Sequence, residues 1–290
     1  MILARLFGGL GNQMFQYACA RRLAHGLGSR LKLDLTAFER YGPRRYALDR
    51  LSPSAEVAAA REVEDFLRRA RVSGRLPRWL LRGIPGLRYE VFRERSFAFD
   101  PAVLELRGNI LLEGYWQSER YFRDIAEVVR REFGLKAAPS AGGAALAARI
   151  LGSNAVSVHV RRGDFVSNPE ASRVHGVCGV DYYRRAVELI AGTELQPHFF
   201  LFSDDPAWAE ENLRLRFPAT LVGSAGQEDA AEHLQLMSLC RHHIIANSTF
   251  SWWGAWLNPK PDKKVIAPQK WFNVETKDTR DLIPAGWTRI

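Results

Sequence analysis

The segment His159-Val160-Arg161-Arg162-Gly163-Asp164 combines residue types that can bind an anion and move a proton. It follows a run of apolar residues that we expect to form a buried strand. An arginine can form paired hydrogen bonds to phosphate oxygens and keeps its charge at physiological pH. Because side chains alternate along a strand, His159 and Arg161 should share one face and Val158 the other. The pattern predicts an anion site at the strand's carboxyl end; the alternative is a structural Arg–Asp pair that closes a turn.

A second candidate anion site lies at Asn247, Ser248 and Thr249, directly after another apolar run. A helix that begins near Phe250 would offer backbone N–H groups to an anion, and the two hydroxyls add further donors. This predicts a phosphate cradle. Helix capping by Ser248 or Thr249 is the alternative.

Two carboxylates follow a third expected strand, in the segment Phe202-Ser203-Asp204-Asp205. Such a pair suits the hydroxyls of a ribose or a bound metal ion. The spacing is not Asp-X-Asp, so it supports a divalent metal only weakly. Capping of the next helix by Ser203 or by one of the aspartates is the alternative.

The N-terminal segment Gly8-Gly9-Leu10-Gly11-Asn12-Gln13 joins an expected strand to an expected helix. It matches neither the full dinucleotide-binding fingerprint nor a P-loop, so it does not support dinucleotide or ATP binding. A tight turn needs the glycines, but it does not need the amides of Asn12 and Gln13. A last segment, 113–119, places Tyr115 and Trp116 beside polar groups, which suits sugar recognition as well as ordinary packing.

Elements with a regular α/β pattern must position these segments. The N-terminal half begins with an expected strand at 2–7, a helix at 12–27 and a strand at 31–35, which form a β-α-β unit. Helices are also expected at 56–72 and 118–133, and a strand at 109–113. In the C-terminal half strands and helices alternate, beginning with a strand, at 155–160, 181–190, 198–202, 206–213, 220–222, 230–240, 244–246, 250–257 and 264–267.

An Ala- and Gly-rich stretch, 136–145, separates the two halves and is expected to be a linker. We therefore expect two α/β domains, 1–140 and 141–290. In parallel sheets ligands bind beyond the carboxyl ends of the strands. The predicted anion segments all lie at such ends.

Composition and charge narrow the class of protein. The 290 residues are 47% hydrophobic and 25% charged, which is ordinary for a folded domain and excludes disorder. The net charge of +9 favours anionic partners, but no run of five like charges marks a nucleic-acid tail, and we expect no nucleic-acid partner. Three scattered cysteines form neither a disulfide framework nor a zinc site. There is no signal peptide and no apolar run of about 18 residues, so we expect a cytoplasmic protein.

Five motifs together resemble the galactoside α-1,2-fucosyltransferases of glycosyltransferase family 11. In chain order they are GGLGNQMFQYA, GYWQSERYF, HVRRGD, FSDD and IIANSTFSWWGAWLN. The likeness runs from about residue 5 to about 275. Where it implies an acidic residue this chain has His233, and neighbouring Glu232 is expected to take its place.

The resemblance implies a GT-B fold, two Rossmann-like domains facing a cleft. The donor would be GDP-β-L-fucose, bound mainly by the second domain, and the acceptor a terminal β-galactoside, bound by the first. An inverting transfer would form an α-1,2 linkage without a metal ion or other cofactor. The donor-binding residues implied are His159, Arg161, Ser203, Asp204, Asp205, Glu232, Asn247, Ser248, Thr249 and Phe250.

The catalytic groups implied are Arg161, which would clamp the β-phosphate, Asn12, which would orient phosphate or acceptor, and a carboxylate base. Asp164 is the first candidate for the base and Glu113 the second. Alternatives are a related GT-B transferase with another linkage or nucleotide sugar, and a noncatalytic glycan- or nucleotide-binding protein. The basic surface suggests peripheral contact with an anionic membrane that carries lipid-linked acceptors.

Overall fold

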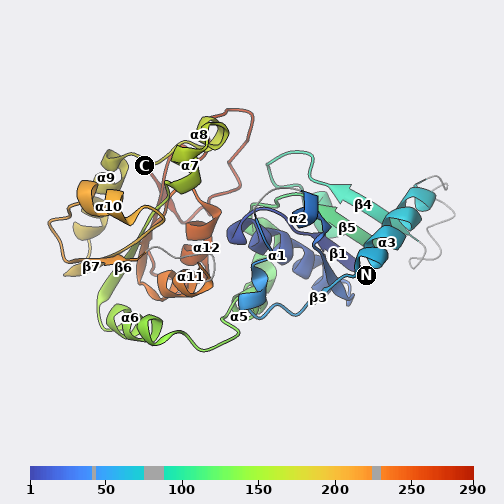
Figure 1. Ribbon diagram of the computed structural model, residues 1–290, viewed down its shortest axis with the longest axis horizontal. Coiled ribbons are helices and arrows are strands. Elements are labelled where there is room, and N and C mark those ends of the chain that lie inside the picture. The colour runs from blue at the N-terminus through green and yellow to red at the C-terminus, as the bar shows by residue number, and fades with distance from the viewer. Residues whose placement is uncertain (41–43, 75–87, 224–229) are drawn as a thin grey trace. The chain divides into compact units, whose positions relative to one another are not determined.

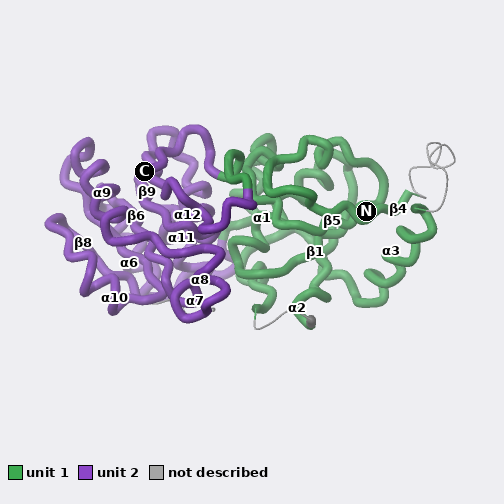
Figure 2. The backbone as a smooth tube through the Cα atoms, turned by 90° about the horizontal axis from the view of Figure 1, so that it is seen from above, with its two compact units in different colours: residues 1–134, 278–282 green, residues 135–277, 283–290 purple. Residues whose placement is uncertain are grey.

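The computed structural model describes residues 1–40, 44–74, 88–223 and 230–290 (Figure 1). The chain forms two compact units (Figure 2). Unit 1 comprises residues 1–134 and 278–282, and unit 2 comprises 135–277 and 283–290. The division precedes the expected boundary at residue 140. The reason lies at Ser140, whose backbone N–H and hydroxyl both donate to Glu232 of unit 2, at 2.8 and 2.7 Å.

Unit 1 is built on a parallel sheet with the strand order β3-β2-β1-β5-β4. Its strands are β1 (Ile2–Arg5), β2 (Leu31–Asp34), β3 (Glu56–Val57), β4 (Tyr89–Arg93) and β5 (Asn109–Glu113). Its helices are α1 (Leu10–Gly26), α2 (Thr36–Arg40), α3 (Ala60–Ser73) and α5 (Ala126–Glu132). The expected β-α-β opening is confirmed, and β1 lies at the centre of the sheet.

The helix expected at 118–133 is wrong over its first half. The chain there forms two 3₁₀ turns, Glu119–Tyr121 and Arg123–Ile125, and only then α5. Tertiary packing prevails over helical periodicity here, since Tyr121 is buried and its hydroxyl accepts the Asp100 N–H at 2.8 Å. The first residues of the helix expected at 56–72 instead form β3, and the sequence analysis missed β4 altogether.

Unit 2 has a six-stranded parallel sheet with the order β11-β10-β9-β6-β7-β8. Its strands are β6 (Asn154–Val160), β7 (Pro197–Ser203), β8 (Ala219–Val222), β9 (His242–Ile244), β10 (Val265–Ala267) and β11 (Thr288–Arg289). Its helices are α6 (Ala141–Leu151), α7 (Gly163–Ser167), α8 (Pro169–His175), α9 (Val180–Ala191), α10 (Pro206–Asn212), α11 (Ala230–Leu239) and α12 (Thr249–Leu257). The expected alternation is confirmed, with α7, α8 and β11 added to it.

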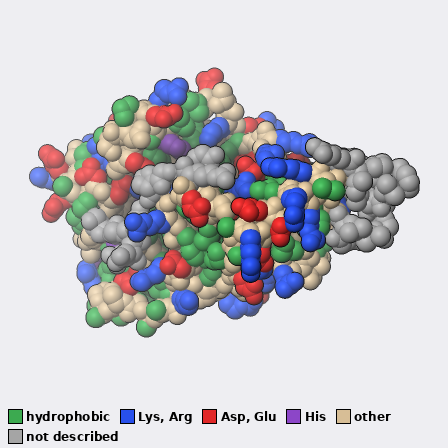
Figure 3. All heavy atoms as spheres, turned by 45° about the vertical axis from the view of Figure 1, so that its right-hand side comes forward, with side chains coloured by type: hydrophobic (Ala, Val, Ile, Leu, Met, Phe, Trp, Pro, Cys, Tyr) green, Lys and Arg blue, Asp and Glu red, His purple; other side chains and the backbone are tan. Residues whose placement is uncertain are grey.

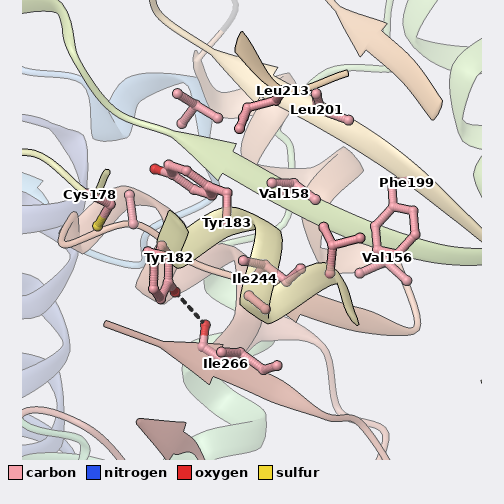
Figure 4. Close-up of a cluster of buried hydrophobic side chains, with 14 of the residues drawn as sticks. Val156, Val158, Cys178, Tyr182, Tyr183, Phe199, Leu201, Leu213, Ile244 and Ile266 are labelled. Carbon is pink, nitrogen blue, oxygen red and sulfur yellow. Dashed lines mark hydrogen bonds between the residues drawn. The ribbon is translucent and has the colours of Figure 1, made fainter. Parts of the chain in front are cut away.

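One face of this sheet packs against α9 and α10 (Figure 4). Val156 and Val158 of β6 lie in this core with Tyr182 and Tyr183 of α9, and the Tyr182 hydroxyl donates to the Ile266 carbonyl oxygen at 3.2 Å. Side chains alternate along a strand, so the intervening positions of β6 face the opposite side. His159 therefore lies on the face opposite Val158, as the sequence predicts, and this face is the one near α11 and α12.

Two details of unit 2 differ from expectation. The stretch 136–145 is only partly a linker, because α6 begins at Ala141 and Ser140 caps it by accepting the Gly143 N–H at 2.9 Å. The strand expected at 244–246 is β9 and begins at His242. Burial of two consecutive histidines explains the shift, since the Nδ1 of His243 lies 2.8 Å from the Ser157 hydroxyl on β6.

Surface charge is unevenly divided between the units. Unit 1 carries 25 Lys and Arg against 18 Asp and Glu, while unit 2 carries 16 against 14. On the face of the molecule drawn in Figure 3, basic side chains are interspersed with acidic ones. In the described part of the chain, no helix is both long and apolar enough to cross a membrane.

Candidate active site

The order of strands in unit 2 creates a point at which successive connections diverge. From β6 the chain proceeds to β7 and β8 on one side, whereas β9, β10 and β11 lie on the other. Open α/β sheets bind ligands in the crevice beyond the carboxyl ends of the strands at such a switch point. Arg161 follows β6, and α12 begins a few residues after β9. The two predicted anion segments are thus brought to the same edge of the sheet, with the His159 and Phe250 rings 5.5 Å apart.

Arg161 is held from two directions. Its Nη1 lies 2.7 Å from Oδ2 of Asp204, and its Nη2 lies 2.5 Å from Oδ1 of Asp164. The guanidinium also lies over the Phe165 ring, 5.2 Å from its centroid. The Arg161 side chain is 24% exposed to solvent, so an anion can still reach it. Arg161 is a positioned cation at the switch point.

Asp204 is fixed by more than this ion pair. Its Oδ1 accepts the Arg162 N–H at 2.8 Å, and a Cβ on Gly163 would lie only 2.5 Å from its Oδ2. Gly163 therefore lets the start of α7 approach the carboxylate closely. The side chain of Asp204 joins the end of β7 to the end of β6.

The neighbouring residues Ser203 and Asp205 serve the start of α10. The Ser203 hydroxyl accepts the Asp205 N–H at 2.9 Å, and Asp205 caps the helix by accepting the Trp208 N–H at 3.2 Å. Asp205 also pairs with the Nε of Arg162 at 3.1 Å, and the Arg162 guanidinium lies 4.0 Å from the centroid of the Trp208 ring. Helix capping, the alternative interpretation of this segment, is what the structure shows.

His159 is a buried neutral imidazole. It is only 6% exposed, and its Nδ1 finds no hydrogen-bond partner among the described residues. Burial, followed by the charges of Arg161 and His233, lowers its pKa to about 3. A neutral imidazole can donate or accept a hydrogen bond without adding charge. His159 is therefore suited to contact a ligand at this edge but not to carry a proton at neutral pH.

The beginning of α12 is capped by Ser248, whose hydroxyl accepts the Phe250 N–H at 3.3 Å. The first N–H groups of a helix have no partner within the helix and carry the positive end of its dipole. Thr249 and Phe250 form this first turn. The segment can serve as both a cap and an anion cradle, because an approaching phosphate can compete for the same N–H groups.

Asn247 has a structural role. Its side chain is buried, and its Nδ2 donates to the carbonyl oxygens of His175, Gly176 and Trp271, at 2.9, 3.3 and 3.2 Å. These bonds fix the segment after α8 and the segment before α12 against each other. Asn247 therefore supports the site from behind.

Glu232 is not brought to Arg161. Its carboxylate accepts both the backbone N–H and the hydroxyl of Ser140, and a Cβ on Gly143 would lie 2.1 Å from its Oε1. It therefore anchors the start of α6. The adjacent His233 lies instead on the β7 side, with its ring 5.8 Å from that of Phe202, and contributes to the low pKa of His159. The sequence analysis favoured the carboxylate, but the imidazole faces the sheet.

Unit 1 has its own switch point, between β1 and β5. Asn12 lies there, and its Oδ1 accepts a hydrogen bond from Nε2 of Gln117 at 3.0 Å. Gly8 has φ +78, and a Cβ on it would lie 2.8 Å from Nδ2 of Asn12, which explains the need for glycine in this turn. Gln13 is structural: its amide donates to the carbonyl oxygens of Gly8 and Arg45.

The loop after β5 is strained and braced. Trp116 has φ +57, and the carboxylate of Glu94 accepts the N–H groups of Tyr115 and Trp116, at 2.8 and 2.9 Å. Strain of this kind persists where the surroundings enforce it, often at functional sites. The sequence analysis missed Glu94; it included Gln117 in the segment 113–119 but gave it no role of its own. The GYWQ motif was the available signal for Gln117, whereas Glu94 lies in a stretch with no recognised motif.

Glu113, the second candidate base, lies at the end of β5 between two arginines. Its Oε2 is 3.0 Å from Nη1 of Arg5 and 3.3 Å from Nε of Arg93. Arg5 also pairs with the buried Asp34 at 2.7 Å. Glu113 therefore belongs to a charge network along the edge of the unit 1 sheet.

Replacing Ser248 with alanine should separate capping from ligand binding. Loss of the cap should lower the free energy of unfolding by about 1 kcal/mol. Loss of a hydroxyl donor to a charged phosphate should lower kcat/KM about tenfold. Ser140→Ala is the matched control, because Ser140 also caps a helix of unit 2. Equal losses of activity in the two variants would show that Ser248 is only a cap.

The buried histidines predict acid sensitivity of the fold. With a folded-state pKa of about 3, His159 stays neutral while the unfolded chain binds a proton below about pH 6.5. Stability should therefore fall as pH drops from about 6.5 toward 3, by about 1.4 kcal/mol per pH unit for this group. Urea unfolding between pH 6 and 4.5 should show a shallower slope for His159→Gln than for the wild type. An unchanged slope would contradict this account.

The described residues form no cluster of side chains that could ligate a metal ion. No group of three or more His, Cys, Asp or Glu side chains among them is placed to hold an ion. The three cysteines are all buried and not disulfide-bonded. The charged side chains nearest the switch point of unit 2 pair with one another instead.

Comparison with known proteins places this arrangement in a family. The sequence profile of glycosyl transferase family 11 matches residues 76–290. The chain is 35% identical to an α-1,2-colitosyltransferase of Escherichia coli, over 100% of this chain and 99% of the relative. It is 28% identical to galactoside α-(1,2)-fucosyltransferase 1 of Pan troglodytes, over 86% of this chain and 63% of the relative.

A solved structure shares the fold. The NodZ α-1,6-fucosyltransferase soaked with GDP-fucose superposes with a TM-score of 0.52 at 17% identity, covering 89% of this chain and 92% of that one. The two parallel sheets thus have the architecture of the GT-B fold expected from the motifs. With a profile match over most of its length and a relative aligned from end to end, the chain belongs to glycosyl transferase family 11.

Proposed function

We propose that this glycosyltransferase moves L-fucose from GDP-β-L-fucose to the 2-hydroxyl of a terminal β-galactoside, with inversion, to form an α-1,2 linkage. The observation that carries the proposal is the meeting of Arg161 and the start of α12 at one switch point. The relatives named as α-1,2-colitosyl- and galactoside α-(1,2)-fucosyltransferases support the linkage and the acceptor class.

The donor diphosphate would bind between Arg161 and the first turn of α12. As the bond to the sugar breaks, negative charge grows on the leaving phosphate. Fixed donors that point at developing charge lower the barrier most effectively, because they need no reorganisation during the reaction. Arg161 supplies a cation, and Ser248, Thr249 and Phe250 supply hydroxyl and amide donors. We propose that these groups take the place of a metal ion, so that transfer proceeds in EDTA.

For the other residues of the site, contacts with the guanine and ribose of the donor stay predictions. His159 has an unsatisfied buried nitrogen, which favours a direct hydrogen bond to the donor. The carboxylates of Asp204, Asp205 and Glu232 already serve Arg161, Arg162 and Ser140. Their contacts support a positioning role more strongly than a direct contact with ribose or guanine.

Deprotonation of the acceptor hydroxyl would fall to Asp164. Its carboxylate is 38% exposed beside Arg161, whereas Glu113 is held between Arg5 and Arg93. As the acceptor oxygen attacks C1 of fucose, its proton passes to Asp164 and GDP leaves with the bonding electrons of the C1–O bond. Asn12, oriented by Gln117, stays a predicted polar contact to a ligand at the switch point of unit 1.

Colitosyl transfer is the second candidate, because a relative aligned over its full length is a colitosyltransferase. Colitose is L-fucose without its 3-hydroxyl, so the two donors differ by one polar group. A site that hydrogen-bonds this hydroxyl would reject colitose by roughly 10⁴-fold or more, whereas an apolar site would discriminate only about 10²-fold. Competing the two GDP-sugars at equal concentration would decide between them.

The test of the proposal is transfer from GDP-fucose to lactose and N-acetyllactosamine in EDTA, with the product linkage determined by NMR. The proposal expects an α-1,2-fucosyl galactoside. A different linkage, or transfer only from another nucleotide sugar, would contradict it in favour of a related transferase. GDP binding without turnover on any acceptor would favour a noncatalytic binding protein.

A further inference from the structure

Asp164 and Asp204 both pair with Arg161, but they are held very differently. Asp204 has a second bond, to the Arg162 N–H, and packs tightly against Gly163. Its side chain is 24% exposed, against 38% for Asp164. Asp204 is therefore built into the junction of β6 and β7. Asp164 lies at the start of the short helix α7 and is the more exposed of the two partners, so moving its carboxylate away from Arg161 would leave Nη2 to a phosphate.

In the ion pairs at this strand end, carboxylates outnumber arginines. Arg161 and Arg162 pair with three carboxylates, Asp164, Asp204 and Asp205. A diphosphate brings further negative charge to the same guanidinium. Like charges at contact distance repel strongly where water is partly excluded. A phosphate that approaches Arg161 would be repelled by the Asp164 carboxylate and would compete with it for Nη2.

We infer that Asp164 and the donor phosphate compete for Nη2 of Arg161, and that donor binding displaces Asp164 from it. Arg161 stays in position because Asp204 and the Phe165 ring still hold it. A guanidinium can exchange one oxyanion for another without changing its geometry, since carboxylate and phosphate oxygens fit the same fork. This inference rests on the proposed function and gives Asp164 a second role in it.

The exchange couples donor binding to the creation of the base. Paired with Arg161, the Asp164 carboxylate is a poor proton acceptor, because protonation would break its ion pair. Once phosphate has displaced it, the same carboxylate can accept the proton of the acceptor hydroxyl. The acceptor oxygen then bonds to C1 of fucose as the C1–O bond to GDP breaks. Donor must accordingly bind before the acceptor hydroxyl is activated.

Asp164→Asn should therefore change donor affinity and turnover in opposite directions. The amide keeps the shape of the side chain but no longer competes with phosphate for Arg161. We expect GDP to bind roughly tenfold more tightly by isothermal titration calorimetry, in EDTA, because a competing anion has been removed. We expect kcat to fall at least about 10²-fold, because the base is lost. A residue that merely orients Arg161 would give weaker GDP binding instead.

Three further variants serve as comparisons for the GDP affinity and turnover of Asp164→Asn. Asp204→Asn should weaken GDP binding roughly tenfold, because it loosens the fixed partner of Arg161. Asp262→Asn, which breaks the exposed Arg241–Asp262 pair at the other end of the strands, should change neither quantity. Asp164→Ser repeats the test with a smaller side chain if the asparagine variant is unstable.

The outcomes separate this inference from the proposed function. Weaker or unchanged GDP binding by both Asp164 variants would overturn the exchange, and an unchanged kcat would overturn the role of Asp164 as base. Absence of GDP binding by the wild-type enzyme would overturn the proposed function itself. Tighter GDP binding with slower transfer supports the inference.

Discussion

Replacing Arg161 with lysine should lower kcat/KM for glycosyl transfer by about 10²–10³-fold, the loss typical of removing one preorganised donor to a developing anion. Lysine preserves the charge but not the planar fork that can pair with Asp204 and phosphate together. In the structure Nη1 and Nη2 of Arg161 point to two different oxyanions, and a single ammonium cannot reproduce this arrangement.

Initial rates with GDP-fucose and lactose would measure this effect. Arg162→Lys is the matched comparison, because Arg162 is adjacent in sequence but pairs with Asp205 and stacks on Trp208. Its variant should retain most of its activity, since Arg162 pairs with Asp205 and stacks on Trp208 and is not the proposed phosphate contact. Equal losses in both variants would indicate general damage to the end of β6 instead of a specific phosphate clamp.

Glu132→Ala should destabilise unit 1 by about 3–5 kcal/mol, the cost of leaving a buried partner charge unpaired. Glu132 is 5% exposed and accepts hydrogen bonds from the Tyr17 hydroxyl at 2.6 Å, the Ser54 hydroxyl at 2.5 Å and Nε of Arg21 at 2.9 Å. Burial, together with the bond to Glu132, raises the pKa of Tyr17. The carboxylate joins α1, α5 and the segment around Ser54 at one point.

Urea denaturation gives the free energy for this comparison. Glu132→Gln should cost less than Glu132→Ala, because the amide oxygen can still accept from Tyr17 or Ser54. Glu127→Ala on the same helix is the control, since Glu127 is exposed and its removal should cost about 0.5 kcal/mol or less. A loss below about 1 kcal/mol for Glu132→Ala would show that the network does not carry the stability assigned to it.

The sequence was most informative where strands are buried on both faces. Apolar runs such as those of β6 and β7 stand out because parallel strands cannot alternate with polar residues. The same pattern fails for β3, which has two exposed residues, and for β4, whose stretch lacks helical or strand periodicity. At 118–133 periodicity was present, but buried aromatic residues imposed 3₁₀ turns on the chain.

The sequence predicted at which strand ends the candidate site lies. It did not predict the hydrogen-bond partners of the individual residues. Arg161 and Ser248 lie at the switch point as the motifs suggest. Asn247, predicted as a donor ligand, bonds to neighbouring backbone carbonyls, and Glu232 bonds to Ser140 at the start of α6; their contacts with a donor stay predictions. Polar residues at a strand end can bond either to a ligand or to the chain itself, and composition does not distinguish these outcomes. Glu94 could not be predicted for a different reason: it accepts hydrogen bonds from backbone N–H groups 21 and 22 residues away in the sequence.

Hydrogen exchange of the full-length protein with and without GDP, in EDTA, tests most directly whether the unit 2 switch point holds the donor diphosphate. The account predicts slower exchange for peptides spanning 161–164 and 248–251. Exchange should be unchanged for the opposite ends of the same strands, near Asn154 and His242. Protection elsewhere, with unchanged exchange at 248–251, would contradict the assignment of the site.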